Sequence, residues 1–236
     1  MSRRLVISDI HGCSSTFKAL LEKIMLKKED QLYLLGDYID RGPDSSGVLD
    51  KIMELINDGY KVFPLRGNHE QQALTAEKDY DKKSFYYFMS RINKSDDLLS
   101  KKRKIKKKYR NFMDGLPLFY ELDDFFIVHA GFDFSKTNPF EDEASILNIR
   151  KFKYNKEAAK GKTIVYGHDP TYFNKIEKAV LKRKKKIPLD NGCVYNRAHK
   201  YYDFHRLRRL CCFNLDTYEL IYQENIEPEN HIILSK

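Results

Sequence analysis

Short apolar runs that lead into polar, glycine-containing loops recur through the first 70 residues. Residues 5–7, 32–35 and 61–65 are such runs, and each has the length and the flanking turn residues of a buried strand. Residues 17–24 and 48–56, which lie between them, carry apolar side chains at helical spacing. Strands that alternate with helices in this way predict an α/β (α+β) fold whose first half holds a largely parallel sheet.

The second half of the chain predicts a further group of strands. Strand patterns occupy residues 119–122, 125–128 and 163–166. Residues 209–215 and 219–222 are separated by a short polar turn, which predicts a closing antiparallel hairpin. The polar tail that begins at residue 225 is expected to be loosely held.

Residues 71–116, between these two groups of strands, differ in character. They are polar, they contain an aromatic cluster at residues 85–88, and they end near the lysine-rich run Lys101–Lys108. We expect helices here, arranged as a layer beside the sheets, with the lysine-rich run on a solvated helix face. Because no linker rich in proline, glycine or serine divides the chain, we expect residues 1–236 to form a single domain.

The charge balance favours anionic partners. The chain has 236 residues, of which 42% are hydrophobic, so it can bury a sizeable core, and its formal net charge is +9. Much of the positive surplus lies in Lys101–Lys108 and in a second run, Lys182–Lys186, for which we expect an exposed edge or turn. Two hypotheses stay open for Lys101–Lys108: an ordinary solvated surface, or a docking site for an acidic protein or a nucleic acid.

The cysteines and the N-terminus bear on the compartment in which the protein works. None of Cys13, Cys193, Cys211 and Cys212 forms a CxxC pair, and a chain of this size does not require a disulfide framework. Only three apolar residues follow Arg3–Arg4, which is too few for a signal peptide, and no run approaches membrane-spanning length. We expect a cytoplasmic protein with free thiols and no membrane segment.

The loop Gly36–Gly42 holds the densest group of chemically useful side chains. It follows the apolar run 32–35 and contains Asp37, Asp40 and Arg41. Open α/β sheets bind ligands at the ends of their strands, where carboxylates can hold a divalent cation and a guanidinium can grip a phosphate. Taken alone, the loop fits equally well an ordinary turn that carries a surface ion pair.

Residues of the types that bind metals follow five predicted strands. They are Asp9 with His11, Asp37 with Asp40, Asn68 with His69, His129, and His168. A lone histidine beside a strand is commonly structural, but five such tips from separated parts of the chain favour a shared metal site. The other histidines have no motif around them and are expected at the surface: His199, His205 and His231.

Three blocks of the sequence resemble the signature of a known enzyme family. Asp9–Gly12, Gly36–Gly42 and Arg66–Glu70 resemble, in order and spacing, the three-part signature of phosphoprotein phosphatases of the bacterial and bacteriophage lambda type. The later blocks His129-Ala130-Gly131, Gly167-His168 and Leu189–Val194 extend the resemblance over nearly the whole chain. The chain departs from the family pattern in three places, none of which removes a ligand: Ser8, Ala130 and Asn191.

The resemblance implies a fold and a metal centre. The family belongs to the calcineurin-like metallophosphoesterases, whose fold has two central mixed β-sheets in a sandwich flanked by helices. By resemblance, one metal is held by Asp9, His11 and Asp37. The second metal is held by Asp37, Asn68, His129 and His168, so that Asp37 bridges the two. Carboxylate, amide and imidazole ligands suit two divalent ions of manganese, iron or zinc.

The resemblance also assigns residues to substrate and catalysis. Arg41 and Arg150 grip phosphate oxygens together with Asn68, although Arg150 fits equally an ordinary surface arginine. His69, oriented by Asp40, protonates the leaving group. The attacking hydroxide comes from water activated by the two metals, in a one-step hydrolysis.

Three functions are consistent with these residues. The first is a metal-dependent phosphomonoesterase, a serine/threonine protein phosphatase, whose partners are phosphorylated proteins or other phosphoesters. The second is a symmetrical diadenosine tetraphosphate hydrolase, because such enzymes share the same blocks. The third is a basic nucleic-acid-binding module built on the two lysine-rich runs.

Overall fold

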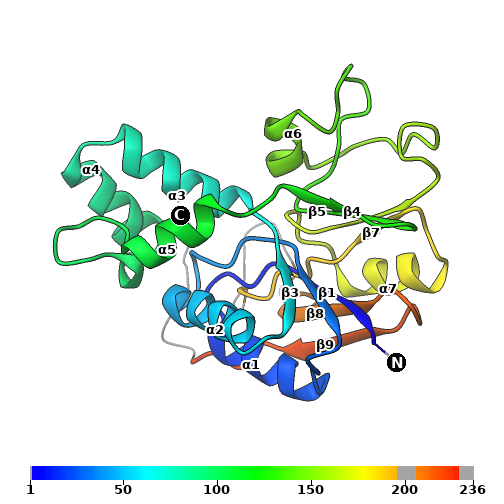
Figure 1. The fold of residues 1–236 in the computed structure, drawn as a ribbon, viewed down its shortest axis with the longest axis horizontal. Helices are drawn as coiled ribbons and strands as arrows, with labels where there is room; N and C mark the ends of the chain where they lie inside the picture. The colour runs from blue at the N-terminus through cyan, green and yellow to red at the C-terminus, as the bar shows by residue number, and fades with distance from the viewer. Residues whose placement is uncertain (1, 196–202, 204–205, 229–236) are drawn as a thin grey trace.

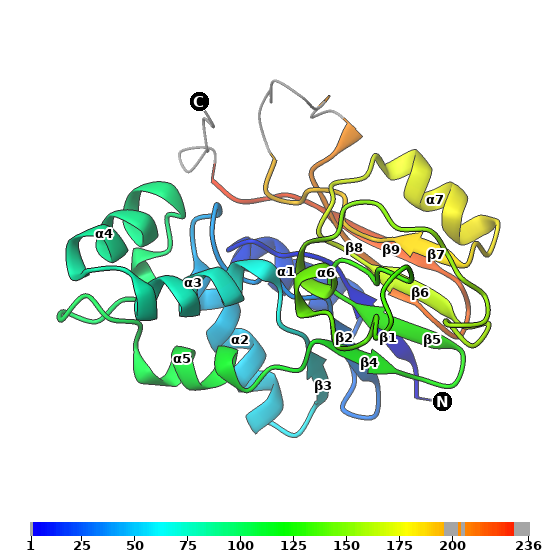
Figure 2. The same cartoon turned by 90° about the horizontal axis from the view of Figure 1, so that it is seen from above.

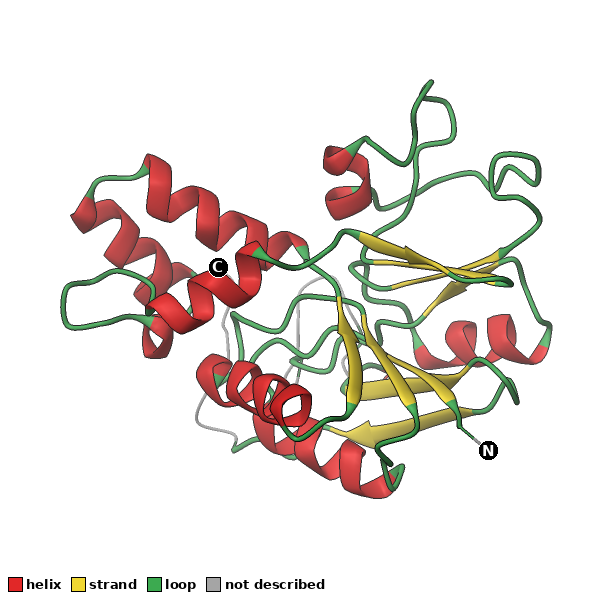
Figure 3. Cartoon of the chain, viewed as in Figure 1, coloured by secondary structure: helices red, strands yellow, loops and turns green. Residues whose placement is uncertain are grey.

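The protein, seen here in a computed structural model that describes residues 2–195, 203 and 206–228, contains two mixed β-sheets that face each other (Figure 1). The first sheet has the strand order β3-β2-β1-β8-β9, with bounds Lys61–Pro64, Gln31–Leu34, Arg4–Ile7, Arg209–Asn214 and Leu220–Glu224. The second has the order β4-β5-β6-β7, with bounds Phe119–Glu121, Phe125–Val128, Thr163–Tyr166 and Lys186–Pro188. Helices flank both sheets (Figure 3), which confirms the predicted fold class.

The first three strands form the predicted parallel unit. β1 pairs with β2 and β2 pairs with β3, both in parallel, and the two connections contain helices α1 (Ser14–Lys23) and α2 (Ser45–Asn57). Asp44 caps α2 by accepting a hydrogen bond from the Gly47 N–H at 2.8 Å. Parallel strands linked by helices place their carboxyl ends along one edge of the sheet, so the loops that follow β1, β2 and β3 meet there.

Both faces of the first sheet are buried, which explains why its strands read as unbroken apolar runs. Leu5 and Ile7 of β1 point into a core shared with α1 and α2, whereas Val6 points into the space between the two sheets. There Val6 belongs to one cluster with Phe125 of β5 and Val165 of β6. Successive side chains of the strand thus point alternately into two apolar cores, instead of one core and the solvent.

Residues 68–114 form a helical layer that projects to one side of the sheets (Figure 2). The layer comprises α3 (Asn68–Asp79), α4 (Lys82–Tyr87), a π-helical turn (Phe88–Ile92), a 3₁₀ turn (Asp96–Leu98) and α5 (Lys107–Asp114). The expectation that Lys101–Lys108 lies on a helix face is wrong for most of this run. Residues 101–104 form a tight turn closed by a bridge between Leu99 and Ile105, and α5 begins only at Lys107. Ile105, the apolar residue within the run, is buried in the core through this bridge, and like charges at neighbouring positions disfavour a helix over residues 101–104.

The second sheet is covered by α6 (Glu143–Asn148), α7 (Phe173–Leu181) and long loops. All four residues of β5 are buried, in agreement with the predicted strand at 125–128. The run Lys182–Lys186 leaves α7 as exposed turn residues, and its last lysine begins β7, the outer strand of the sheet. This short strand was not expected from the sequence because its only buried residue is Ile187.

The closing hairpin is present as β8 and β9, but the expectation of a loosely held tail from residue 225 is wrong for its first residues. Asn225 and Glu227 are buried. The Asn225 side-chain amide donates to the Cys193 carbonyl at 2.7 Å, and the Glu227 carboxylate accepts from the Thr16 N–H at 2.8 Å. Buried hydrogen bonds of this kind hold polar chain that lacks apolar anchors.

The three histidines expected at the surface, His199, His205 and His231, lie outside the described residues. Among the helices of the described ranges, none combines the length and the apolar character that crossing a bilayer demands.

Candidate metal centre

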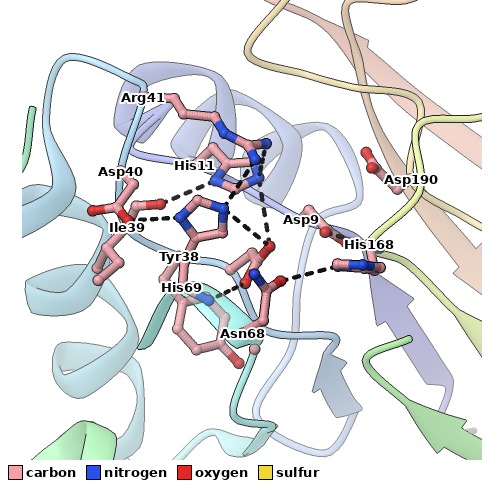
Figure 4. Close-up of polar contacts among 12 residues, drawn as sticks. Asp9, His11, Tyr38, Ile39, Asp40, Arg41, Asn68, His69, His168 and Asp190 are labelled. Atoms are coloured by element: carbon pink, nitrogen blue, oxygen red, sulfur yellow. Dashed lines mark hydrogen bonds and ion pairs between the residues drawn. The ribbon is translucent and has the colours of Figure 1, made fainter. Parts of the chain in front are cut away.

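Loops that follow five strands of the two sheets converge on one site, and Figure 4 shows the polar side chains that they bring together. Every predicted ligand lies within three or four residues of a strand end. They follow β1 (Asp9 and His11), β2 (Asp37), β3 (Asn68), β5 (His129) and β6 (His168). The arrangement explains the spacing of the sequence motifs, because each motif is the loop that leaves one strand.

Asp37 stands between two groups of side chains that could each hold a metal ion. One group is His11, Asp37 and His69, and the other is Asp37, His129 and His168. Within each group the ligand atoms lie within 4.8 Å of one another. Asp37 Oδ2 is 3.6 Å from His11 Nε2, and Asp37 Oδ1 is 3.6 Å from His129 Nε2. One carboxylate that faces both groups has the geometry of a bridging ligand.

Backbone carbonyls fix the orientation of two of these imidazoles. His11 Nδ1 lies 3.0 Å from the Ile39 carbonyl, and His129 Nδ1 lies 2.9 Å from the Leu35 carbonyl. A carbonyl can only accept, so each Nδ1 carries the proton and each Nε2 keeps a lone pair. Burial lowers the pKa of both His11 and His129, which favours the neutral, metal-binding form.

The Asn68 side chain completes a cluster of acceptors. Its Oδ1 lies 3.0 Å from His129 Nε2 and 2.9 Å from His168 Nδ1. His129 Nε2 has no proton in the tautomer set by Leu35, so two acceptors face each other across this gap. Burial, followed by the nearby His129, lowers the pKa of His168 to about 4. Neutral nitrogens and an amide oxygen that converge in this way suit a cation between them.

Asp9 lies beside the second group rather than the first. Its Oδ2 accepts from the His168 N–H at 2.9 Å, and its buried Oδ1 has no hydrogen-bond partner in the described structure. Burial, with the nearby charges of Asp190 and Asp37, raises the pKa of Asp9 well above its usual value. An unpaired buried carboxylate oxygen at this place fits a metal ligand. The geometry does not group Asp9 with His11 and Asp37, so its assignment to the first metal stays a prediction.

His69, the third member of the first group, contacts two carboxylates. Its Nδ1 lies 2.6 Å from Asp40 Oδ2, and its backbone N–H donates to Asp37 Oδ1 at 3.0 Å. Burial lowers the pKa of His69, but the charge of Asp37 and the hydrogen bond to Asp40 outweigh this effect and leave the pKa raised. The structure therefore places the predicted pair His69 and Asp40 in direct contact.

Arg41 reaches into the centre of the site. Its guanidinium lies 2.8 Å from His11 Nε2 and 2.9 Å from His69 Nε2, with one terminal nitrogen on each (Figure 4). A metal held by His11 Nε2 would need the same lone pair, so this contact and a metal at that nitrogen exclude each other. Arg150, in contrast, is 58% exposed and pairs with Asp169 at 2.6 Å, next to His168 in sequence. Its predicted contact with phosphate stays a prediction.

The backbone is strained in the same loops. Five of the predicted site residues have a positive φ: His11 (+49°), Asp37 (+50°), Asp40 (+73°), Arg41 (+69°) and His168 (+68°). This left-handed region costs a non-glycine residue roughly 1–2 kcal/mol. Such strain persists where the surrounding contacts enforce it, and it gathers at functional sites.

Two glycines allow the closest approach of backbone to these carboxylates. A Cβ on Gly167 would overlap Asp9 Oδ1, and a Cβ on Gly67 would overlap Asp37 Oδ1. At Gly67 the Cβ would also overlap the Asp37 backbone nitrogen, so this position requires glycine, whereas at Gly167 it would displace the Asp9 carboxylate. Both glycines belong to the quoted motifs.

Glu70 is a residue whose role the motif analysis missed. Its buried carboxylate accepts four backbone hydrogen bonds at 2.8–3.3 Å, from the N–H groups of Asp37, Tyr38, Ile39 and Gly67. Burial, with the charge of Asp37, raises its pKa to about 7. Its bond to the Gly67 N–H is the glutamate half of a capping box, and Gly67 has no side chain that could supply the other half. Glu70 thus ties the start of α3 to the loop that carries Asp37.

Replacing Glu70 with alanine is expected to lower the free energy of unfolding by about 3–5 kcal/mol, because several buried N–H groups lose their acceptor and each costs about 1–3 kcal/mol. Glu70→Gln, which keeps one acceptor oxygen, should fall between this variant and the wild type. Urea denaturation measures the effect, with the exposed Glu29→Ala as a control. Equal stability of Glu70→Ala and Glu29→Ala would contradict the structural role of Glu70.

Comparison with known proteins places this geometry in a family. The sequence profile described as calcineurin-like phosphoesterase matches residues 2–222. A symmetrical bis(5′-nucleosyl)-tetraphosphatase of Acidovorax sp. (strain JS42) is 44% identical over 71 residues, which cover 30% of this chain and 24% of that protein. Serine/threonine-protein phosphatase 1 of Salmonella typhimurium is 46% identical over 72 residues, which cover 30% of this chain and 31% of that protein. Each match thus covers less than a third of the relative's length.

A solved structure supports the same placement at the level of the fold. A provisionally assigned diadenosine tetraphosphatase superposes with a TM-score of 0.66 at 19% identity, and the superposition covers 95% of this chain and 94% of that one. The family profile spans nearly the whole described chain, from β1 into β9. The chain belongs to the calcineurin-like phosphoesterase family.

Proposed function

We propose that the protein hydrolyses phosphate esters or anhydrides with two divalent metal ions, and that its first candidate substrate is a symmetrical dinucleoside tetraphosphate. The observation that carries the chemistry is Asp37, which faces two groups of metal-binding side chains at once. The substrate rests on the relatives, because most of the curated proteins that match are named symmetrical bis(5′-nucleosyl)-tetraphosphatases. This favours the second of the functions considered from the sequence over the first.

The donor atoms fit the metals that the resemblance implies. Nitrogen and oxygen donors without thiolate suit manganese, iron or zinc. In this proposal His11 and Asp37 hold one ion, with Asp9 as a further ligand, and Asp37, Asn68, His129 and His168 hold the other. When bound, two such ions lower the pKa of a shared water and neutralise charge on the phosphoryl group.

The remaining side chains act on the substrate directly. Once Arg41 releases both His11 and His69, its planar guanidinium can hold two oxygens of the phosphoryl group that is cleaved, with Asn68 on the same group. His69 donates a proton to the leaving oxygen, and Asp40 keeps its ring in the orientation this requires. Arg150 adds a second phosphate contact once it leaves Asp169. In the tetraphosphate, water then adds across the central P–O–P bridge and two nucleoside diphosphates leave.

A second candidate substrate is a phosphoserine or phosphothreonine protein. It is favoured by the 46% identity to the Salmonella serine/threonine phosphatase over its matched stretch. The two substrates differ in how strongly their hydrolysis depends on proton donation by His69. A serine alkoxide is a far poorer leaving group than a nucleoside diphosphate, so the protein substrate depends much more on protonation of the leaving oxygen.

Side-by-side turnover of diadenosine tetraphosphate and a phosphoserine peptide, both with added Mn²⁺, separates the two substrates. The proposal predicts a higher kcat/KM on the tetraphosphate, with two molecules of ADP as the only nucleotide products. AMP with ATP as products would contradict symmetrical cleavage. A higher kcat/KM on the peptide would make the phosphatase the better description. No hydrolysis of either, together with tight salt-dependent binding of RNA, would overturn both and favour the nucleic-acid module.

Chelation is expected to abolish hydrolysis reversibly, since the imidazole and carboxylate donors lose the ions that they hold. Protein treated with EDTA and then dialysed should lose at least about 99% of its turnover, in line with the several kcal/mol that a catalytic metal contributes. Added Mn²⁺ should restore the turnover, whereas added Ca²⁺, which prefers oxygen ligands, should not. Full activity of metal-free protein, confirmed by elemental analysis, would contradict the proposal.

A further inference from the structure

The helical layer reaches the candidate site through a short turn between its π-helical and 3₁₀ turns. Ser95 in this turn is fully buried, and its hydroxyl donates a short hydrogen bond to Asp40 Oδ1. The other oxygen of the same carboxylate, Oδ2, contacts His69 Nδ1 at 2.6 Å. The two oxygens of Asp40 are thus held from opposite sides, one by the helical layer and one by the histidine.

The donors and acceptors of the hydrogen bonds around Ser95 can be assigned consistently. A carboxylate only accepts hydrogen bonds, so the Ser95 hydroxyl donates its single O–H to Asp40. It can then accept from the Ser45 hydroxyl, 3.1 Å away, and Ser45 in turn accepts from the Asp40 N–H at 3.0 Å. These bonds close a ring that fixes both the backbone and the side chain of Asp40.

The same turn is itself rigidly placed. The Ser95 N–H donates to the Met89 carbonyl at 2.7 Å, and the Asn93 carbonyl accepts from the Arg41 N–H at 2.8 Å. The backbone of Arg41 is therefore bound to the helical layer on one side of the turn, and the side chain of Asp40 on the other. A displaced turn would therefore move both Arg41, which is proposed to bind the substrate, and Asp40, which is proposed to orient His69.

We infer that Ser95 is a positioning residue for the Asp40–His69 pair, and that the helical layer serves the reaction by supplying it. The inference rests on the proposed role of His69 as the proton donor to the leaving group. Without the hydroxyl, a buried carboxylate oxygen loses its partner, and Asp40 can rotate about its side-chain bonds to find another. His69 then loses the fixed orientation that transfer to the leaving oxygen requires.

The test is a series of phosphate monoesters whose leaving groups differ in basicity, from 2,4-dinitrophenyl through p-nitrophenyl to phenyl phosphate. Ser95→Ala is expected to lower kcat on phenyl phosphate by about 10- to 100-fold, the usual effect of removing a supporting contact of this kind. Its effect on the dinitrophenyl ester, whose leaving group needs no proton, should be less than about threefold. Ser95→Cys, which keeps the size of the side chain and a weaker donor, should fall between, and it serves if the alanine variant does not fold.

Two further variants make the result specific. Ser90→Ala removes a hydroxyl of the same layer that donates to the Tyr86 carbonyl at 2.6 Å, away from Asp40, so its profile should match the wild type. In a His69→Asn background, Ser95→Ala should add nothing to the slowdown on phenyl phosphate. An equal slowdown on all three esters, or no slowdown on any, would overturn the role of Ser95. If His69→Asn itself slows all three esters equally, the proposed role of His69 fails instead.

Discussion

Replacement of His69 by asparagine is expected to lower kcat on a phosphoserine peptide or phenyl phosphate by about 10²- to 10⁴-fold, the range that a general acid contributes. His69 is buried against Asp40 and belongs to the group with His11 and Asp37, not to the group formed by Asp37, His129 and His168. Asparagine keeps a polar side chain of similar reach but cannot donate a proton in the reaction. The loss on diadenosine tetraphosphate should be smaller, because its leaving group is weakly basic.

Metal content decides how that loss is interpreted. Elemental analysis of His69→Asn should find the same two ions per chain as in the wild type, since the role proposed for His69 is proton transfer. A variant that loses an ion would show that His69 is a ligand, as its proximity to His11 and Asp37 would allow. Unchanged turnover on phenyl phosphate would contradict the general-acid assignment itself.

The second large effect is expected at Asp37. Asp37→Asn preserves the size of the side chain but removes the charge that faces His11 on one side and His129 on the other. The variant should lose at least one of its two metal ions and at least about 100-fold of its turnover on every substrate, whatever the leaving group.

Asp40→Asn is the matched control for this variant, since it changes the same chemical group in the same loop. It should retain both ions and slow only the substrates whose leaving groups need a proton. If Asp37→Asn retains both ions, Asp37 is not the bridge. If both variants lose metal equally, the two carboxylates do not have separate roles.

The strands and the metal-binding loops were predictable because each depends on a local pattern. The runs at 5–7, 32–35 and 125–128 are apolar on both faces, since both sheets are covered on each side. The loops after them contain aspartate and histidine, which form a metal site only when several such loops meet at one end of the sheets. A sequence motif therefore locates Asp37 and His129 without any knowledge of which loops meet in space.

The features that could not be predicted from the sequence depend on contacts between segments that are distant along the chain. Ser95 lies 55 residues from Asp40 and has no motif around it, so nothing local marks it as a support for the site. The tail was expected to be loose because its polar residues lack apolar neighbours, yet Asn225 is held by Cys193, 32 residues away. Glu70 is intermediate: it belongs to the quoted block Arg66–Glu70, but its bonds to the loop at 37–39 could not be predicted.

The most direct test of the account is a titration of Mn²⁺ into chelator-treated protein, followed by electron paramagnetic resonance. Because Asp37 faces both groups of ligands, the account predicts two Mn²⁺ per chain with the spectrum of an exchange-coupled pair. The coupling should disappear in Asp37→Asn. Binding of a single isolated ion, or of two ions without magnetic coupling, would contradict a metal centre built around Asp37.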